Sequence, residues 1–204
     1  MVTPAKMREI VEQIAETDKK FIPVIESSKL CDLGINNSDE THFESLVSSV
    51  ISQQLATAAA RTINQRFKAV TGKVTPRNVV NLSESDLRGA GLSAAKAKTI
   101  QGLASAANSK EIDFNKLHLE EDDLVYSKLT SLWGIGPWTV DMFMMFQLGR
   151  MDIWPTGDLG VRRGWEKIHK LKDEVTPEVL NKKGGKFQPH RSVVAWYCWR
   201  ALEL

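Results

Sequence analysis

A short stretch of the sequence, "LWGIGPWTV" at residues 132–140, carries backbone groups that could bind an anion. Gly134 and Gly136 leave a turn without side-chain cover, because glycine has no Cβ and permits positive φ and close backbone approach. Pro137 suits the first position of the following helix, where its missing N–H costs nothing. The positive end of that helix dipole then faces the same way as the bare N–H groups, which suits a phosphate. The pattern predicts a hairpin between two helices that binds a phosphate and reads no base sequence.

Two aspartates close to this stretch are candidates for chemistry. Asp158 lies in the turn "PTGDLG", directly before the predicted helix "LGVRRGWEKI". An aspartate at that place commonly caps the helix N-terminus, and capping is compatible with catalysis because it aims the carboxylate rigidly. Asp141 lies one turn after Trp138 in the otherwise apolar segment "DMFMMFQL". An acid in such surroundings is either partnered near a helix end or part of a site, so Asp141 is the second candidate.

The segments that must position these residues are predicted to be helices. Apolar residues recur at three- and four-residue steps from Phe43 to Phe67, which indicates one long or broken amphipathic stretch. Ser83 ahead of Asp86 predicts a helix start. No segment alternates polar and apolar residues over a strand length, so the fold class is all-α. Further helices are predicted at "LEEDDLVYSKLTSLW", "TPEVLNKK" and "HRSVVAWYCWRALEL", and "LRGAGLSAAKAKTI" repeats the order helix, Gly-x-Gly turn, helix as a tight corner.

The composition is that of an ordinary globular protein, with 204 residues, 42% of them hydrophobic and 25% charged. No apolar run approaches the roughly 20 residues that span a bilayer. The start "MVTPAKMREIVEQIAE" lacks a signal-peptide core, so we expect an intracellular protein of the cytoplasm, nucleoid or nucleus without a membrane partner. This setting favours a reduced pair of cysteines, Cys31 and Cys198, over a disulfide.

The potential metal ligands and the charge distribution say less about function. Two cysteines cannot form a four-cysteine zinc or iron–sulfur site, and the four histidines are scattered, so we expect no transition metal. We expect no other cofactor, although a monovalent cation bound by the backbone carbonyls of the hairpin stays open. The net charge is only +2, but residues 150–204 hold 11 Lys and Arg against 7 Asp and Glu. This basic end fits either a solvated surface or a phosphate-binding face.

Several motifs together resemble a known family. The segment "LTSLWGIGPWTVDMFMMFQLGRMDIWPTGDLGVRRGW" resembles the helix-hairpin-helix signature of the DNA glycosylase superfamily, running into its Pro-x-x-Asp segment. "GIGPWT", "WPTGDLGVRR" and "PHRSVVAWYCWR" are similar to the DNA-3-methyladenine glycosylase branch, which acts in alkylation repair. "ISQQLATAAA" and "GLSAAKAKTI" resemble its upstream helices, so the resemblance covers roughly residues 40–204.

The resemblance implies a fold of two helical lobes with an active-site cleft between them. It places a central helical-barrel lobe, ending in the helix-hairpin-helix, at residues 36–149. Residues 1–35 and 150–204 then form the second lobe from both termini. The expected partner is double-stranded DNA containing alkylated bases, bound by a monomer.

The resemblance also implies a reaction. Asp158 matches the family carboxylate that stabilises the oxocarbenium-like sugar and orients or activates the attacking water. The glycosylases that are also lyases place a lysine where this chain has Trp138, and tryptophan cannot form a Schiff base. The expected enzyme is a monofunctional glycosylase of base excision repair that excises purines such as 3-methyladenine and leaves the strand intact.

The remaining site residues are implied by the same resemblance. The damaged base must leave the duplex before the enzyme can reach its glycosidic bond, so the site needs a base pocket and a residue that fills the vacated stack. Trp138, Met142, Asp141, Trp154 and His190 are assigned to the base pocket, with Phe187 and Tyr197 as companions. For every tryptophan except Trp138, packing in the core is the favoured alternative. Intercalation is assigned to Leu55, which alternatively belongs to the core stripe, and to Gln54. Phosphate binding is assigned to Gly134, Gly136, Trp138, Lys96 and Arg162, with Arg163 beside it; for the lysine and the two arginines a solvated surface position is the alternative.

Three other hypotheses remain open at this point. The chain could be a non-catalytic helix-hairpin-helix module that binds DNA, or a glycosylase for another lesion such as deaminated adenine. It could also be an unrelated all-α protein with a fortuitous hairpin, which would show no salt-dependent binding to DNA.

Overall fold

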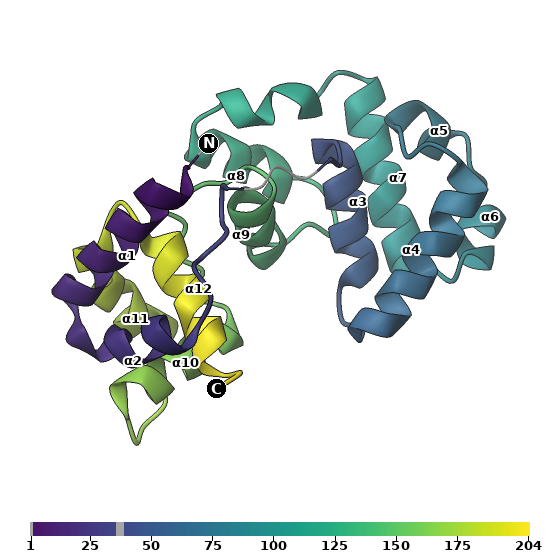
Figure 1. The fold of residues 1–204 in the computed structure, drawn as a ribbon. Coiled ribbons are helices and arrows are strands. Elements are labelled where there is room, and N and C mark those ends of the chain that lie inside the picture. The colour runs from purple at the N-terminus through teal and green to yellow at the C-terminus, as the bar shows by residue number, and fades with distance from the viewer. Residues whose placement is uncertain (1, 36–38) are drawn as a thin grey trace. The chain divides into compact units, whose positions relative to one another are not determined.

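The computed structural model describes residues 2–35 and 39–204, which form helices, turns and loops without a β-strand (Figure 1). The predicted all-α class is therefore confirmed. The chain divides into two compact units, a central unit of Ser38–Phe143 and a terminal unit of Met1–Asn37 with Met144–Leu204. The predicted boundary at residue 36 lies outside the described residues. The second division falls after Phe143, inside a helix and ahead of the predicted boundary at residue 149.

The central unit is built from the middle of the chain. Its helices are α3 (His42–Ser52), α4 (Thr57–Thr71), α5 (Pro76–Val80), α6 (Glu84–Gly89), α7 (Ala94–Asn108), the 3-10 helix η2 (Phe114–Leu119), α8 (Asp122–Thr130) and α9 (Pro137–Phe146). The division between the units falls within α9. Figure 1 shows α3, α4 and α7 packed side by side, in blue and teal. Leu46 and Ile51 of α3 and Ile100 and Leu103 of α7 are fully buried in this core.

The terminal unit is built from both ends of the chain. Its helices are α1 (Pro4–Thr17), η1 (Lys19–Phe21), α2 (Ile22–Ser27), α10 (Leu159–His169), α11 (Pro177–Gly184), η3 (Gly185–Phe187) and α12 (Arg191–Ala201). Helices α10 and α12 pack against each other at Gly164, where an added Cβ would lie only 1.9 Å from the carbonyl oxygen of Cys198. Backbone therefore meets backbone at this crossing, which only a glycine permits.

Side-chain caps begin many of these helices. A hydroxyl or carboxylate oxygen accepts a hydrogen bond from an N–H of the first turn, which otherwise has no intrahelical partner. The predicted start at Ser83 is confirmed as a capping box with Asp86. The side chains that cap α-helices are Thr3, Thr41, Thr75, Ser83, Ser93, Asp158 and Thr176, and Asp18 and Asp113 cap the 3-10 helices η1 and η2.

Both cysteines lie in the terminal unit as buried free thiols, in agreement with the predicted reduced pair. Burial raises the pKa of the Cys31 thiol to about 12. Such a thiol is nucleophilically inert near neutral pH. None of the described helices is both long and apolar enough to cross a membrane.

A half-buried carboxylate in the terminal unit connects segments from the two ends of the chain. Asp18 Oδ2 accepts hydrogen bonds from His169 Nε2 at 3.0 Å and from Lys186 Nζ at 2.9 Å. The Asp18 side chain is only 11% exposed. Burial alone would raise the pKa of Asp18, but the bonds from His169 and Lys186 outweigh it and lower the pKa from 3.8 to about 2.

This shift predicts an acid-sensitive contribution to stability. The unfolded chain binds the Asp18 proton more readily, so the free energy of unfolding gains about 2 kcal/mol above pH 4 and loses it as the pH falls towards 2. We expect Asp18→Asn to be less stable than the wild type by about 2 kcal/mol at pH 6 and equally stable near pH 2. Urea titrations at several pH values measure this difference. A difference that stays constant with pH would contradict the assignment.

Candidate nucleic-acid interface and active site

The predicted hairpin is confirmed between α8 and α9. Within its turn, the Ile135 N–H donates to the Leu132 carbonyl at 3.1 Å, and the Ile135 side chain is buried. Gly134 has φ +83°, and an added Cβ would lie 2.0 Å from Thr99 Oγ1. Gly136 has no positive φ, and an added Cβ would meet nothing within 4 Å. The two glycines therefore differ: Gly134 is required by the fold, whereas Gly136 leaves open space at the start of α9.

This difference predicts opposite behaviour for two alanine variants. Gly134→Ala combines a strained φ with a clash, so we expect it to lower the stability of the protein by about 2 kcal/mol. Gly136→Ala should fold normally but weaken DNA binding by about fivefold, because a Cβ obstructs a phosphate at the helix N-terminus. Thermal melting and fluorescence anisotropy with a DNA duplex separate the two effects. A stable Gly134→Ala protein would contradict this account of the turn.

The break between α3 and α4 places two predicted DNA contacts on a turn. Gln54 has a left-handed φ of 56°, which is uncommon for a residue with a Cβ. Leu55 is 38% exposed, and its N–H donates to the Ser52 carbonyl at 3.2 Å. The alternative in which Leu55 belongs to the core stripe is therefore wrong. An exposed leucine at the tip of a tight turn has the position that an intercalating wedge needs.

A side-chain bridge joins this turn to the hairpin. Gln53 Nε2 donates to Thr139 Oγ1 at 3.1 Å and lies 3.5 Å from the Gly134 carbonyl oxygen. Thr139 is itself buried. The candidate wedge and the candidate phosphate-binding turn are thus neighbours on one side of the central unit.

Lys96 does not have the surface position that a phosphate contact implies. Its ammonium group is half-buried and donates to the carbonyl oxygens of Ile51 at 2.8 Å and Gln53 at 2.6 Å. Burial lowers the pKa of Lys96. The contacts in the structure thus give this lysine a partner within the protein, at the C-terminus of α3.

A hollow of about 300 Å³ in the central unit brings together two of the residues predicted to contact the base, Trp138 and Met142. Trp138 is 48% exposed there. Asp141 is absent from its lining; together with burial, the charge of Asp141 raises the pKa of Tyr126 on α8 instead. The lining consists of Glu40, Ser45, Ser48, Ser49, Ser52, Gln53, Trp138, Thr139 and Met142.

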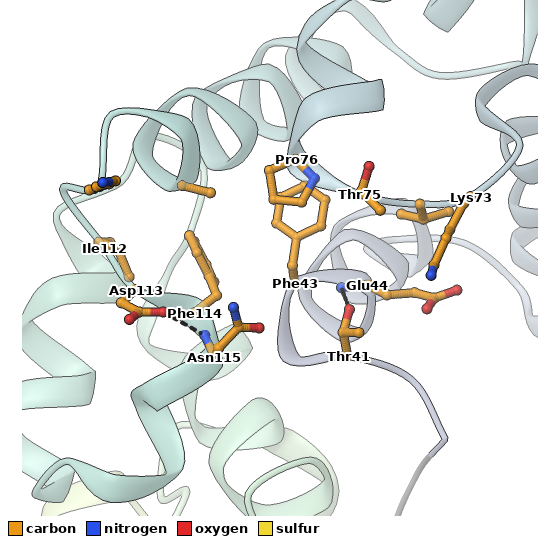
Figure 2. Close-up of a pocket in the computed structure, with 13 residues that line it drawn as sticks. Thr41, Phe43, Glu44, Lys73, Thr75, Pro76, Ile112, Asp113, Phe114 and Asn115 are labelled. Carbon is orange, nitrogen blue, oxygen red and sulfur yellow. Dashed lines mark hydrogen bonds between the residues drawn. The ribbon is translucent and has the colours of Figure 1, made fainter.

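A larger hollow, of about 640 Å³, lies elsewhere in the central unit (Figure 2). It lies around the start of α3, the loop between α4 and α5, and the residues before η2, with Phe43, Ile112 and Phe114 among its lining. None of the residues predicted to contact the base, intercalate or bind phosphate lines it. Size alone therefore does not identify the site in this protein.

In the terminal unit, Asp158 is fixed by two donors. Its Oδ1 accepts from the Val161 N–H at 2.7 Å, which confirms the predicted cap of α10. The same oxygen accepts from Trp199 Nε1 at 2.9 Å. The Trp199 ring stacks on Phe146 with centroids 5.8 Å apart. The two hydrogen bonds hold the carboxylate in one orientation, and Asp158 is only half-buried, so it is not sealed inside the core.

Trp199 was not among the residues predicted for the site. The signal that could have indicated it is Gly160, where an added Cβ would lie 2.8 Å from Trp199 Cδ1. A glycine in the first turn of a helix leaves room for a large side chain beside the capping residue.

The segment that leads into α10 is anchored to the start of α12. The Ile153 N–H donates to Ser192 Oγ at 2.8 Å, and Ser192 Oγ donates to the Arg150 carbonyl at 2.8 Å. Arg191 forms a two-point pair with Asp152, with Nε–Oδ1 and Nη2–Oδ2 distances of 2.8 Å. Because Ser192 is fully buried, this network holds the chain just before the capping carboxylate in one conformation.

The other aromatic residues proposed for the base pocket have structural partners in the terminal unit. Trp154 Nε1 donates to the Leu180 carbonyl at 3.0 Å. Phe187 and Tyr197 are buried in the core, so their assignment to the pocket is wrong. His190 is half-buried directly before α12, and burial lowers its pKa. The hydrogen bond of Trp154 and the burial of Phe187 and Tyr197 favour packing roles for these three residues, whereas the pocket role of His190 stays a prediction.

The two predicted arginines after the cap differ in their partners. Arg163 is exposed and pairs with Glu166 at 2.9 Å and also with Glu174. Arg162 is half-buried, and its Nε has no hydrogen-bond partner in the part of the chain that the structure describes. That Nε is shielded from solvent, so it is not evidence for a phosphate contact, and phosphate binding by Arg162 stays a prediction. Among residues 2–35 and 39–204, no cluster of three histidine, cysteine or acidic side chains could hold a metal ion.

The chain is similar to a known protein family and to a protein from yeast. Residues 47–189 match the family described as HhH-GPD superfamily base excision DNA repair protein. The DNA-3-methyladenine glycosylase 1 of Schizosaccharomyces pombe is 33% identical over 167 residues, which cover 79% of this chain and 73% of that protein.

Two solved structures resemble most of the chain. A DNA-3-methyladenine glycosidase from Bacillus halodurans is 33% identical with a TM-score of 0.83, covering 94% of this chain and 88% of that one. The 3-methyladenine DNA glycosylase of Schizosaccharomyces pombe in complex with abasic DNA is 28% identical with a TM-score of 0.77, covering 92% of each chain. Both matches extend over both compact units.

Proposed function

We propose that this chain, which belongs to the HhH-GPD superfamily of base excision DNA repair proteins, is a monofunctional DNA glycosylase that excises alkylated purines such as 3-methyladenine. The main support for the proposal is the orientation of the Asp158 carboxylate, which hydrogen bonds from the Val161 N–H and Trp199 Nε1 hold in place. A rigid, half-buried carboxylate suits stabilisation of a sugar cation better than a flexible surface acid does.

The proposed reaction is hydrolysis of the N-glycosidic bond. As the bond between C1′ and the base nitrogen breaks, its electron pair leaves with the base and positive charge develops on the deoxyribose. The Asp158 carboxylate stabilises that charge and orients a water molecule. The water oxygen bonds to C1′, and the released proton passes to Asp158 or to solvent. The product is an abasic site in an intact strand.

Trp138 supports hydrolysis without strand cleavage. It occupies the hairpin position where the bifunctional relatives have a lysine, and an indole cannot form a Schiff base. Its exposed ring also offers a π face to a cationic alkylated purine. Together with Met142 it lines the 300 Å³ hollow, which we assign to base recognition.

The central unit supplies most of the proposed contacts with DNA. The turn at Gly134 and Gly136 binds a phosphate, Leu55 enters the base stack, and Gln54 lies beside the vacated position. A kinked duplex favours eversion of the damaged base, and poorly paired lesions are the easiest to extrude. The enzyme then acts in whichever compartment holds DNA, with no need for a second copy of the chain.

A base-release assay tests this function. Duplex DNA treated with a methylating agent is incubated with the protein, and the freed bases are identified by chromatography. Release of 3-methyladenine is the expected result. Release of 7-methylguanine and hypoxanthine as well would indicate a broad pocket. Binding to abasic DNA without any release would favour a non-catalytic DNA-binding module.

A further inference from the structure

The turn that carries Leu55 adopts a conformation that its own sequence does not favour. Gln54 has φ 56°, a left-handed conformation that is usually taken by glycine or asparagine. Such a conformation persists only when surrounding contacts determine it, and it often marks a functional segment. The contacts around the turn therefore indicate which residues keep Leu55 in place.

Lys96 makes the strongest of these contacts. Its Nζ donates to the carbonyl oxygens of Ile51 and Gln53, at 2.8 and 2.6 Å, on both sides of the point where α3 ends. The last carbonyls of a helix lack intrahelical partners and carry the negative end of the helix dipole, which an ammonium group satisfies. The lysine belongs to the first turn of α7, so it connects a well-packed helix to the turn.

A second contact holds the turn from the opposite direction. The Gln53 carboxamide donates to the buried Thr139 hydroxyl of α9 at 3.1 Å. Its backbone carbonyl is one of the two oxygens that bind Lys96. The residue just before Gln54 is thus held by its side chain on the hairpin and by its main chain on α7.

From this geometry we propose that Lys96 is a positioning residue that holds the Gln53–Ala56 turn in its binding conformation. Leu55 can then enter the DNA without the entropy cost of ordering the turn at that moment. The proposal rests on the proposed function. It assigns the ammonium to the protein's own carbonyls instead of to a DNA phosphate. The neighbouring Lys98 differs: it is exposed, and its Nζ lies 4.2 Å from the centroid of the Trp133 ring.

A double-mutant cycle between Lys96 and Leu55 tests the proposal. The variants are Lys96→Met, Leu55→Ala, both together, and Lys98→Met as the matched control on the same helix. Each is titrated with a duplex containing a tetrahydrofuran abasic analogue and with the undamaged duplex. A 2-aminopurine opposite the analogue reports intercalation at saturating protein, where a change in affinity alone has no effect.

Lys96→Met is expected to reduce the preference for the abasic duplex by about tenfold, as Leu55→Ala does, and to remove most of the 2-aminopurine signal. Added to Leu55→Ala, it should change that preference by less than about twofold, because it acts through Leu55. Lys98→Met should weaken binding to both duplexes equally and keep the signal.

Two results would overturn the inference. One is a double variant in which the effects of Lys96→Met and Leu55→Ala on the preference for the abasic duplex multiply. The other is a full 2-aminopurine signal in Lys96→Met. Thermal melting checks that Lys96→Met folds; if it does not, Lys96→Gln, which keeps one donor, replaces it in the cycle. A wild type that intercalates but releases no methylated base would refute the proposed function and leave this inference standing. A wild type that gives no 2-aminopurine signal would overturn the inference whatever its base release.

Discussion

Replacing Asp158 by asparagine is expected to reduce base release from methylated DNA by about 100-fold or more. The amide removes the negative charge that faces the developing sugar cation and cannot accept a proton from water. Because Asp158 is not among the residues proposed to bind the phosphates or the base stack, affinity for an abasic duplex should stay similar or rise. Single-turnover base release and anisotropy measurements separate the two steps.

The substitution should leave the fold intact. Asparagine is as good an N-cap as aspartate, and its Oδ1 can accept from both the Val161 N–H and Trp199 Nε1. Asp158→Ala, in contrast, removes both acceptors and should lower the free energy of unfolding by about 1–2 kcal/mol. The pair of variants therefore distinguishes a loss of catalysis from a loss of capping.

Asp113→Asn is the matched control for the change of charge. Asp113 caps η2 through the Asn115 N–H, so it has the same type of local contact without a proposed part in the reaction. It should release bases at the wild-type rate. If Asp158→Asn retained more than about a tenth of the wild-type rate, the carboxylate would be a cap only.

Local patterns predicted much of the architecture. The hairpin at Gly134 and Gly136, the capping box at Ser83 and the cap by Asp158 each depend on neighbours a few residues apart, and each is confirmed. The pattern from Phe43 to Phe67 left a long helix and a broken one open, because apolar spacing continues through the break. The break itself depends on a left-handed residue that glycine would have signalled and glutamine does not.

Contacts between distant residues could not be predicted in the same way. Lys96 looked like a surface cation because nothing in its own helix shows that the end of α3 lies beside it. For Trp154 a pocket role and core packing both stayed open, because an aromatic side chain has the same pattern in a core and at a site. Trp199 was missed because its partner is 41 residues away. In each case the tertiary contact, and not the residue type, decides the role.

The crossing of α10 and α12 at Gly164 predicts the largest loss of stability. In Gly164→Ala the new Cβ would lie 1.9 Å from the Cys198 carbonyl oxygen and 2.8 Å from its Cα, so α10 and α12 must separate. A backbone clash cannot be relieved by a change of rotamer. We expect a loss of about 3 kcal/mol or more, which lowers the melting temperature by roughly 6–12 °C. Calorimetry or urea unfolding measures it.

Gly185→Ala, in the same unit, is the matched control. Gly185 has helical dihedrals, φ −54° and ψ −36°, and an added Cβ would meet nothing within 4 Å. Alanine is accommodated there and restricts the unfolded chain, so the free energy of unfolding should stay equal or rise by up to about 1 kcal/mol. Because α10 begins at the capping Asp158, separating α10 from α12 should also move the carboxylate away from Trp199. Gly164→Ala should thus lose base release even below its melting temperature, and a variant that melts and reacts like the wild type would refute the backbone contact.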